Sequence, residues 1–192
     1  MLSSENKETL QRYGENFNKW LETPKGKEEM TSHSEHENYF KQKMYQKNLT
    51  VLSEEDFGEI WKRTWASRMW VNKDWYVKNR LIAANGFEKI RKELITLLYG
   101  SHDFAEGYDN FRQNVHGFGV SLLSEFLNMI FPEKFCLWNL TPRRVLPFLG
   151  ISSIPNDILN SSNPSGSEYK QSMDSLNFIR EELVSYGGKR FY

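Results

Sequence analysis

Cysteine is almost absent from this chain of 192 residues, which contains only Cys136. A single cysteine cannot form an intrachain disulfide, so the chain does not read as a disulfide-stabilised secreted domain. No apolar run approaches the ~18 residues that would suggest a membrane span, and the first residues lack the basic-then-apolar pattern of a signal peptide. These absences argue against membrane and secreted classes and predict a cytoplasmic protein.

Signatures of metal and nucleotide binding are also missing. The histidines are His33, His36, His102 and His116, and only His33 and His36 lie at helical spacing, without the further ligands that a metal site requires. No G-x-x-x-x-G-K-[ST] loop occurs, and no Ser/His/Asp order stands out. We therefore expect neither a metal nor another cofactor.

An excess of charge is lacking too, since 25 basic residues balance 25 acidic ones. The distribution is uneven, however. Residues 1–60 carry 8 basic and 12 acidic side chains, whereas residues 61–80 carry six basic side chains against Asp74 alone. The six are Lys62, Arg63, Arg68, Lys73, Lys78 and Arg80. This basic segment favours a polyanionic partner such as nucleic acid.

Four of the six tryptophans fall in the same segment, at Trp61, Trp65, Trp70 and Trp75. Aromatic side chains interleaved with Arg and Lys can form a stacking surface for a single strand or a flipped base. In the alternative interpretation, Trp61 and Trp65 lie one helical turn apart and fill the core, while the basic residues form a solvated face.

Helical periodicity dominates the chain and no strand alternation is evident, so we predict an all-α fold of at least seven helices without a substantial β-sheet. Pro24-Lys25-Gly26 is expected to break the first helix, and Thr141 with Pro142 to begin a later one. The domain organisation is a single helical domain over 1–192, with N-terminal helices in 1–50, a core in 53–151 and a C-terminal helix. The predicted helices are 4–22, 35–47, one from about 53, 72–85, 87–99, 109–115, 119–130, 141–149 and 168–186.

The motif with most functional content is Val115-His116-Gly117-Phe118-Gly119-Val120-Ser121, followed by an apolar helix. Glycine permits a positive φ and a close backbone approach, so such a turn allows the N–H groups of Gly117 to Val120 to hold a phosphate. A plain interhelical turn explains the same glycines and stays open as the alternative.

A second stretch, residues 134–146, adds candidate contacts. Arg143 and Arg144 lie in the first turn of the predicted helix, where cations oppose the helix dipole, so phosphate contact is one explanation and a surface salt bridge the other. Trp138 and Asn139 are predicted to line a pocket in which the amide reads a base edge. Asn139 as a helix cap is the alternative.

These two stretches resemble the helix-hairpin-helix base-excision DNA glycosylases. Val115 to Gly119 is similar to their hairpin, and Phe135-Cys136-Leu137-Trp138 leads to Asn139 where those enzymes have a catalytic Asp. Val120-Ser121 occupies the place of their Lys, where present. Because neither Asn nor unassisted Ser supplies that chemistry, the resemblance implies the fold without base excision. An active glycosylase using Glu125 or Glu133 is the alternative.

Residues 53–151 also resemble a helical module at the N-terminus of McrB-type and related AAA+ restriction ATPases. The similarity lies in Leu94 to Gly100, Gly117-Phe118-Gly119, Pro132 to Phe135, Trp138-Asn139 and Leu149-Gly150. It implies a DNA-contacting module whose ATPase or nuclease lies elsewhere in the chain or on a partner. The abrupt end at Phe191-Tyr192 indicates a piece of a longer chain.

We therefore predict a noncatalytic DNA-binding module of a restriction or defence system. A protein-interaction domain, with the aromatic segment as a partner surface, is the alternative from another class. The predicted DNA contacts are Arg63, Arg68, Lys73, Gly117, Phe118, Gly119, Val120, Ser121, Lys134, Trp138, Asn139, Arg143 and Arg144.

Overall fold

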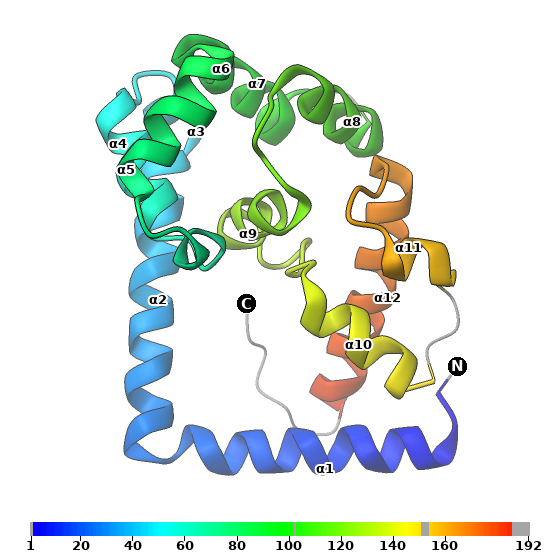
Figure 1. Cartoon of the computed structure of the whole chain (residues 1–192). Helices are drawn as coiled ribbons and strands as arrows, with labels where there is room; N and C mark the ends of the chain where they lie inside the picture. Colours follow the sequence, from blue (N-terminus) through cyan, green and yellow to red (C-terminus); the bar gives the residue numbers. More distant parts are fainter. Residues whose placement is uncertain (1, 102, 151–153, 186–192) are drawn as a thin grey trace.

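The fold consists of helices, as predicted. The structure is a computed structural model that describes residues 2–101, 103–150 and 154–185, and within these ranges it contains no β-strand (Figure 1). In chain order the elements are α1 (Ser4–Leu21), α2 (Pro24–Met44), α3 (Gln46–Leu49), α4 (Glu54–Lys62), the 3-10 helix η1 (Ala66–Met69), α5 (Lys73–Tyr76), the π-helical turn η2 (Val77–Ile82), α6 (Ala83–Asn85), α7 (Phe87–Tyr99), α8 (Phe104–Asn114), α9 (Val120–Ile130), α10 (Leu140–Phe148), α11 (Asn156–Asn160) and α12 (Gly166–Ser185).

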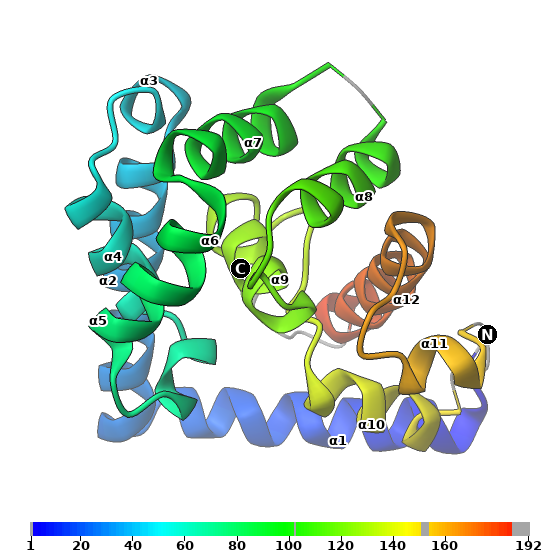
Figure 2. The ribbon, with the colours of Figure 1, turned by 45° about the horizontal axis from the view of Figure 1, so that its top comes forward.

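The long helices form a frame around α9. In both orientations α1 lies along one side, α2 rises almost at right angles from its end, α7 and α8 cross the side opposite α1, and α12 closes the frame (Figures 1 and 2). The central position of α9 follows from its sequence, because nine of its eleven residues are buried and its apolar side chains point in nearly every direction. One hydrophobic core therefore joins elements from both halves of the chain.

The predicted break of the first helix at Pro24-Lys25-Gly26 is confirmed, since α1 ends at Leu21, but these residues also begin the next helix. Pro24 is the first residue of α2, a position at which its missing N–H costs nothing, and Thr23 caps the helix by accepting a hydrogen bond from Gly26 N. The segment is therefore a corner between two helices. The helix expected over 35–47 starts eleven residues earlier than predicted, because its exposed first half carries polar residues that hide the apolar periodicity.

Two further boundaries differ from the prediction. Helix α8 begins at Phe104, since Asp103 caps it through bonds from Ala105 N and Glu106 N, so the polar linker is shorter than expected. The cap of α10 is Asn139 rather than Thr141. By contrast, the helix expected over 72–85 runs from Lys73 to Asn85, and the C-terminal helix spans Gly166–Ser185.

No helix among the described residues is both long enough and apolar enough to cross a lipid bilayer.

Candidate nucleic-acid interface

The predicted turn between two helices is present, formed by residues 115–119 between α8 and α9. Gly117 has a φ of +89°, and a Cβ added there would lie 2.6 Å from Leu81 Cδ2. Gly117 thus serves the turn and its packing, whereas Gly119 has an ordinary φ of −67° and open space where a Cβ would be. Phe118 points inward and is only 4% exposed, so it belongs to the core and not to a DNA-contacting surface, contrary to our prediction.

The two glycines predict opposite mutational effects. Gly117→Ala is expected to lower the free energy of unfolding by about 1–2 kcal/mol, because alanine disfavours a positive φ and meets Leu81. Gly119→Ala, the matched control, should change stability by less than ~0.5 kcal/mol. Urea unfolding followed by circular dichroism measures both. Equal losses would show that Gly117 is not the strained position.

The segment 73–85 lies beside this turn and forms hydrogen bonds with it. Tyr76 donates its hydroxyl proton to Gly117 O (3.3 Å), while Asn85 accepts from His116 N (2.7 Å) and donates to His116 O (2.9 Å). The basic, tryptophan-rich segment and the hairpin, more than thirty residues apart in the chain, are therefore neighbours. A common binding surface would require these two regions to lie side by side, as they do here.

The first turn of α9 presents backbone donors. Gly119 is its N-cap and provides no side-chain bond, and the first bond back to the cap is from Leu123 N to Gly119 O (3.0 Å). The N–H groups of Val120, Ser121 and Leu122 have no acceptor among the described residues. The Ser121 side chain is exposed there, while that of Val120 is buried.

The tryptophans divide between core and surface. Trp61 is fully buried, as the core interpretation predicted, but Trp65, Trp70 and Trp75 are 56%, 45% and 48% exposed. The rings of Trp61 and Tyr76 stack with centroids 4.9 Å apart, and Tyr76 lies 4.1 Å from Trp70. A column of three rings thus runs from the core to the surface, and its middle ring is the one that binds the hairpin.

Arginines lie over the exposed rings of the same region. The Arg68 guanidinium is 3.5 Å from the Trp65 ring centroid, Arg80 is 5.8 Å from that of Trp75, and Arg63 is 4.2 Å from that of Tyr39. Burial lowers the pKa of His36, and the positive charges of Arg63 and Arg68 lower it further. The positive charges of Arg63 and Arg68 therefore act on the neighbouring His36 side chain.

Two lysines of the segment are engaged within the protein. Lys62 pairs with Glu59 and with Asp74 (3.0 Å), and these hydrogen bonds raise its pKa. Lys73, a predicted DNA contact, donates to Lys62 O (3.1 Å) and is half-buried. The accessible cations of the segment are therefore the three arginines and Lys78, which are all exposed.

A buried carboxylate holds the tryptophan-bearing loop against α9. Glu125 is 2% exposed and accepts hydrogen bonds from Trp65 N (2.5 Å) and Ala66 N (3.1 Å) at the start of η1. Burial raises the pKa of Glu125, while these two bonds and the charge of Arg68 oppose the rise. Both oxygens face the protein backbone, so Glu125 acts as a structural anchor.

Helix α10 carries the second group of candidates. Asn139 accepts from Thr141 N (2.9 Å) and is the helix cap, which was the alternative left open. Trp138 is 0% exposed, and its backbone N–H donates to Ser124 Oγ (3.0 Å). The predicted pocket lined by Trp138 is therefore wrong, because the indole is enclosed in the core.

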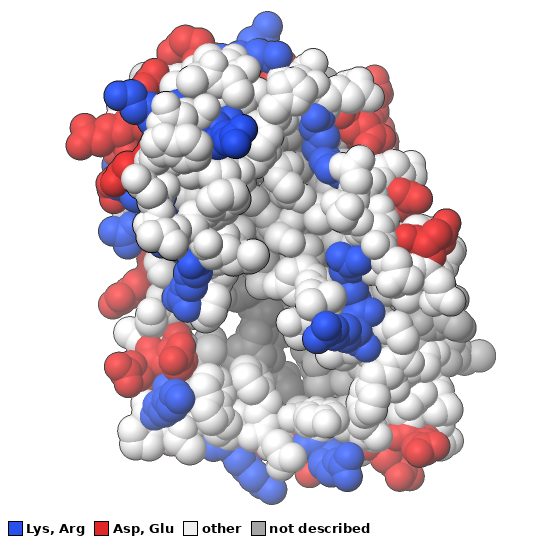
Figure 3. Space-filling view, in the orientation of Figure 1, with Lys and Arg blue, Asp and Glu red and all other residues white. Residues whose placement is uncertain are grey.

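The two arginines of α10 differ in their exposure and in their hydrogen bonding. Arg143 donates from Nε to Leu159 O and is half-buried, whereas Arg144 is exposed and has no partner among the described residues. In the space-filling view, basic side chains lie over α10 and also on the opposite, η1 side of a hollowed region, and most acidic side chains lie around the outline (Figure 3).

Lys134 lies apart from these groups. It borders an apolar cavity of about 310 Å³ beyond the C-terminal end of α9, with its ammonium 5.6 Å from the Phe131 ring centroid. The hairpin is at the other end of α9, which at 1.5 Å per residue is roughly 16 Å away. The structure thus does not bring Lys134 together with the hairpin.

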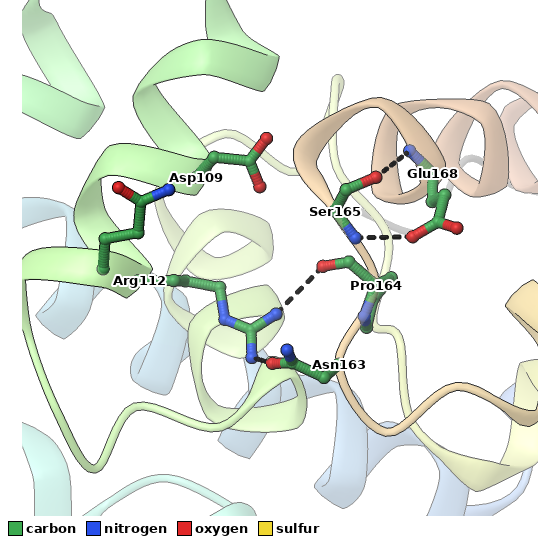
Figure 4. A pocket seen from close by; sticks show the side chains of 7 residues that line it. Asp109, Arg112, Asn163, Pro164, Ser165 and Glu168 are labelled. Atoms are coloured by element: carbon green, nitrogen blue, oxygen red, sulfur yellow. Dashed lines mark hydrogen bonds between the residues drawn. The ribbon is translucent and has the colours of Figure 1, made fainter.

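A second cavity, of about 320 Å³, lies between α8 and the start of α12 (Figure 4). Arg112 donates to Pro164 O (2.9 Å) and to Asn163 Oδ1, and Asp109 accepts from Gly166 N (2.8 Å). Ser165 and Glu168 bind each other's backbone N–H groups, which is a capping box. These polar groups join two segments of the fold and leave no donor set aimed at a ligand.

No group of three or more potential metal-ligating side chains occurs within residues 2–101, 103–150 and 154–185. Comparison with known protein families, curated proteins and solved structures found no match to this chain.

Proposed function

We propose that this chain is a DNA-binding module without base-excision activity. The observation that carries the proposal is the Tyr76 hydroxyl bond to Gly117 O. It joins the turn before α9 to exposed Trp70, whose neighbouring helix η1 places Arg68 over Trp65. Backbone amides at a helix N-terminus and guanidinium groups both bind phosphate. Contacts of this kind give affinity without reading sequence.

The proposal excludes glycosylase chemistry because of where the candidate catalytic side chains lie and what they bind. Asn139 caps α10, and Glu125 has both oxygens hydrogen-bonded to backbone N–H groups. Glu133 is exposed, and its backbone carbonyl accepts from Arg180. We infer that a chemical step, if one follows binding, is performed by an ATPase or nuclease elsewhere in the chain or on a partner.

The restriction or defence role stays part of the proposal through the resemblance of residues 53–151 to the McrB-type modules. A cytoplasmic site of action fits it. The single cysteine, Cys136, is half-buried, and burial raises the pKa of its thiol. One cysteine cannot form an intrachain disulfide, which suits a reducing compartment.

Salt dependence of DNA binding tests the proposal. We expect Arg68→Ala combined with Arg144→Ala to flatten the slope of log affinity against log salt by about one to two units, at ~0.7–0.9 per lost phosphate contact. Fluorescence anisotropy with labelled oligonucleotides measures the slope. Arg143 is left intact because its Nε supports Leu159.

The matched control is Lys47→Ala with Lys170→Ala, which removes the same charge from exposed positions on α3 and α12. Its slope should equal that of the unmodified chain. Absence of salt-sensitive DNA binding would overturn the proposal in favour of a protein-interaction domain. Release of a base by the unmodified chain, above a no-enzyme control, would overturn it in favour of an enzyme.

A further inference from the structure

The exposed end of the ring column indicates which kind of DNA is bound. Trp61 stacks on Tyr76 at an interplanar angle of 16°, and Trp70 packs on Tyr76 at a tilt of 39°. The described residues add no further ring to Trp70, which is 45% exposed. A large indole that is nearly half exposed at the end of this series of ring contacts has room for another planar ring. Nucleobases are planar rings that stack on tryptophan with little dependence on sequence.

The loop that carries Trp70 is held in place before any ligand arrives. Glu125 fixes the start of η1, Ser67 N donates to Thr64 Oγ1 (3.1 Å), and Trp70 N donates to Ser67 O (3.0 Å). A loop fixed in this way loses little conformational entropy when a ligand binds. The tryptophans are therefore presented as a preformed surface.

Cations lie over two of the exposed rings of this region, where guanidinium groups are available to phosphates. Arg68, in the 3-10 helix η1, covers Trp65 at its N-cap, while Trp70 is its C-cap, and Arg80 approaches Trp75. Tyr76, the middle ring, also reaches Gly117 at the open turn of α9. Exposed aromatic rings and cations are thus found together in residues 65–80, next to the turn that precedes α9.

Resting on the proposed function, we propose that this surface binds an unpaired nucleobase, with the outer face of Trp70 stacking on it as the fourth ring of the column. In an intact duplex both faces of each base are covered by neighbouring bases, so only a single strand or a base displaced from a duplex offers a free face. The aromatic surface and its cations together discriminate against fully paired DNA.

The test compares three labelled ligands of the same sequence: a single strand, its perfect duplex, and that duplex with one unpaired base. We expect the unmodified chain to prefer either ligand with an unpaired base over the perfect duplex. Trp70→Ala should weaken binding to the preferred ligand by roughly 5- to 150-fold, as loss of one stacked base predicts. The salt slope should not change, because no charge is removed.

Trp70→Phe retains a ring and should recover part of the affinity, which separates stacking from a folding defect. The matched control is Tyr45→Ala. Tyr45 is an exposed ring with Lys47 5.7 Å from its centroid, and it lies near Tyr99, which borders the cavity at the other end of α9. The Tyr45→Ala variant should bind all three ligands with the same affinity as the unmodified chain.

The outcomes are distinct. Salt-sensitive binding with equal or higher affinity for the perfect duplex, unaffected by Trp70→Ala, would overturn this inference and leave the proposed function intact. Absence of salt-sensitive binding to all three ligands would overturn both. A preference for the single strand over the duplex with one unpaired base, or the reverse, identifies the source of the base.

Discussion

Replacing Phe118 with alanine is expected to lower the free energy of unfolding by about 3–5 kcal/mol. The side chain is almost fully buried between the two hairpin glycines, and its ring contacts those of Phe57, Phe111 and Phe126 with centroids 5.3–6.2 Å apart. Truncation removes contacts with α4, α8 and α9 together and leaves a cavity where these helices meet. Urea denaturation measures the loss.

The control for Phe118 is Phe148→Ala in α10, whose side chain is 64% exposed. It should cost less than ~0.5 kcal/mol. If Phe118 instead contacted DNA, its replacement would weaken DNA binding and leave stability unchanged. That result would contradict the position of Phe118 in the core.

Glu125→Ala is the change with the second-largest expected effect. It strands the N–H groups of Trp65 and Ala66, each of which now donates to a carboxylate in a partly buried position. Hydrogen bonds to a charged group contribute about 1.5–3 kcal/mol each, and the relieved cost of burying the charge offsets part of their loss. We expect a net destabilisation of about 2–3 kcal/mol, together with weaker DNA binding because the tryptophan loop is released.

Glu133→Ala removes an exposed glutamate from the same half of the chain and should leave both stability and DNA binding nearly unchanged. If Glu125→Ala weakens DNA binding only as much as Glu133→Ala does, the carboxylate does not position the loop.

The pH dependence of stability provides a second measurement on Glu125. Its folded-state pKa is raised above the ordinary value of 4.5, mainly by burial. Its contribution to stability is therefore fully present below about pH 4.5 and is lost as the pH rises through the folded-state pKa. The stability difference between the unmodified chain and Glu125→Gln should fall over that window. A difference that grows with pH would show that the backbone donors outweigh burial.

Local patterns in the sequence predicted the helices and the turn between α8 and α9 because those features depend on residues close together in the chain. The periodicity of α7 and the Gly117-Phe118-Gly119 turn are examples. Asn139 was ambiguous, since capping and base reading require the same side chain. Only the hydrogen bond from Thr141 N decided its position.

The features that the sequence could not predict depend on distant partners. Glu125 is sixty residues from Trp65, and nothing in its apolar helix identifies the acceptor role of its carboxylate. Trp138 and Trp70 are both preceded by an apolar residue, yet one is enclosed and the other exposed. Which indole faces solvent is set by the packing of α9 against η1 and the segment before α10.

The π-helical turn η2 determines the angular position of the groups that hold the hairpin. Tyr76, Leu81 and Asn85 all contact residues 116–117, and they are spaced by five and then four positions. At about 100° per residue, Tyr76 and Asn85 would point in opposite directions on a regular α-helix. One extra residue in the wide turn reduces their separation to about 80°, so both reach the same side. Tyr76 and Asn85 therefore both hydrogen-bond to residues 116–117, because the extra residue in η2 brings their side chains to the same side of the helix.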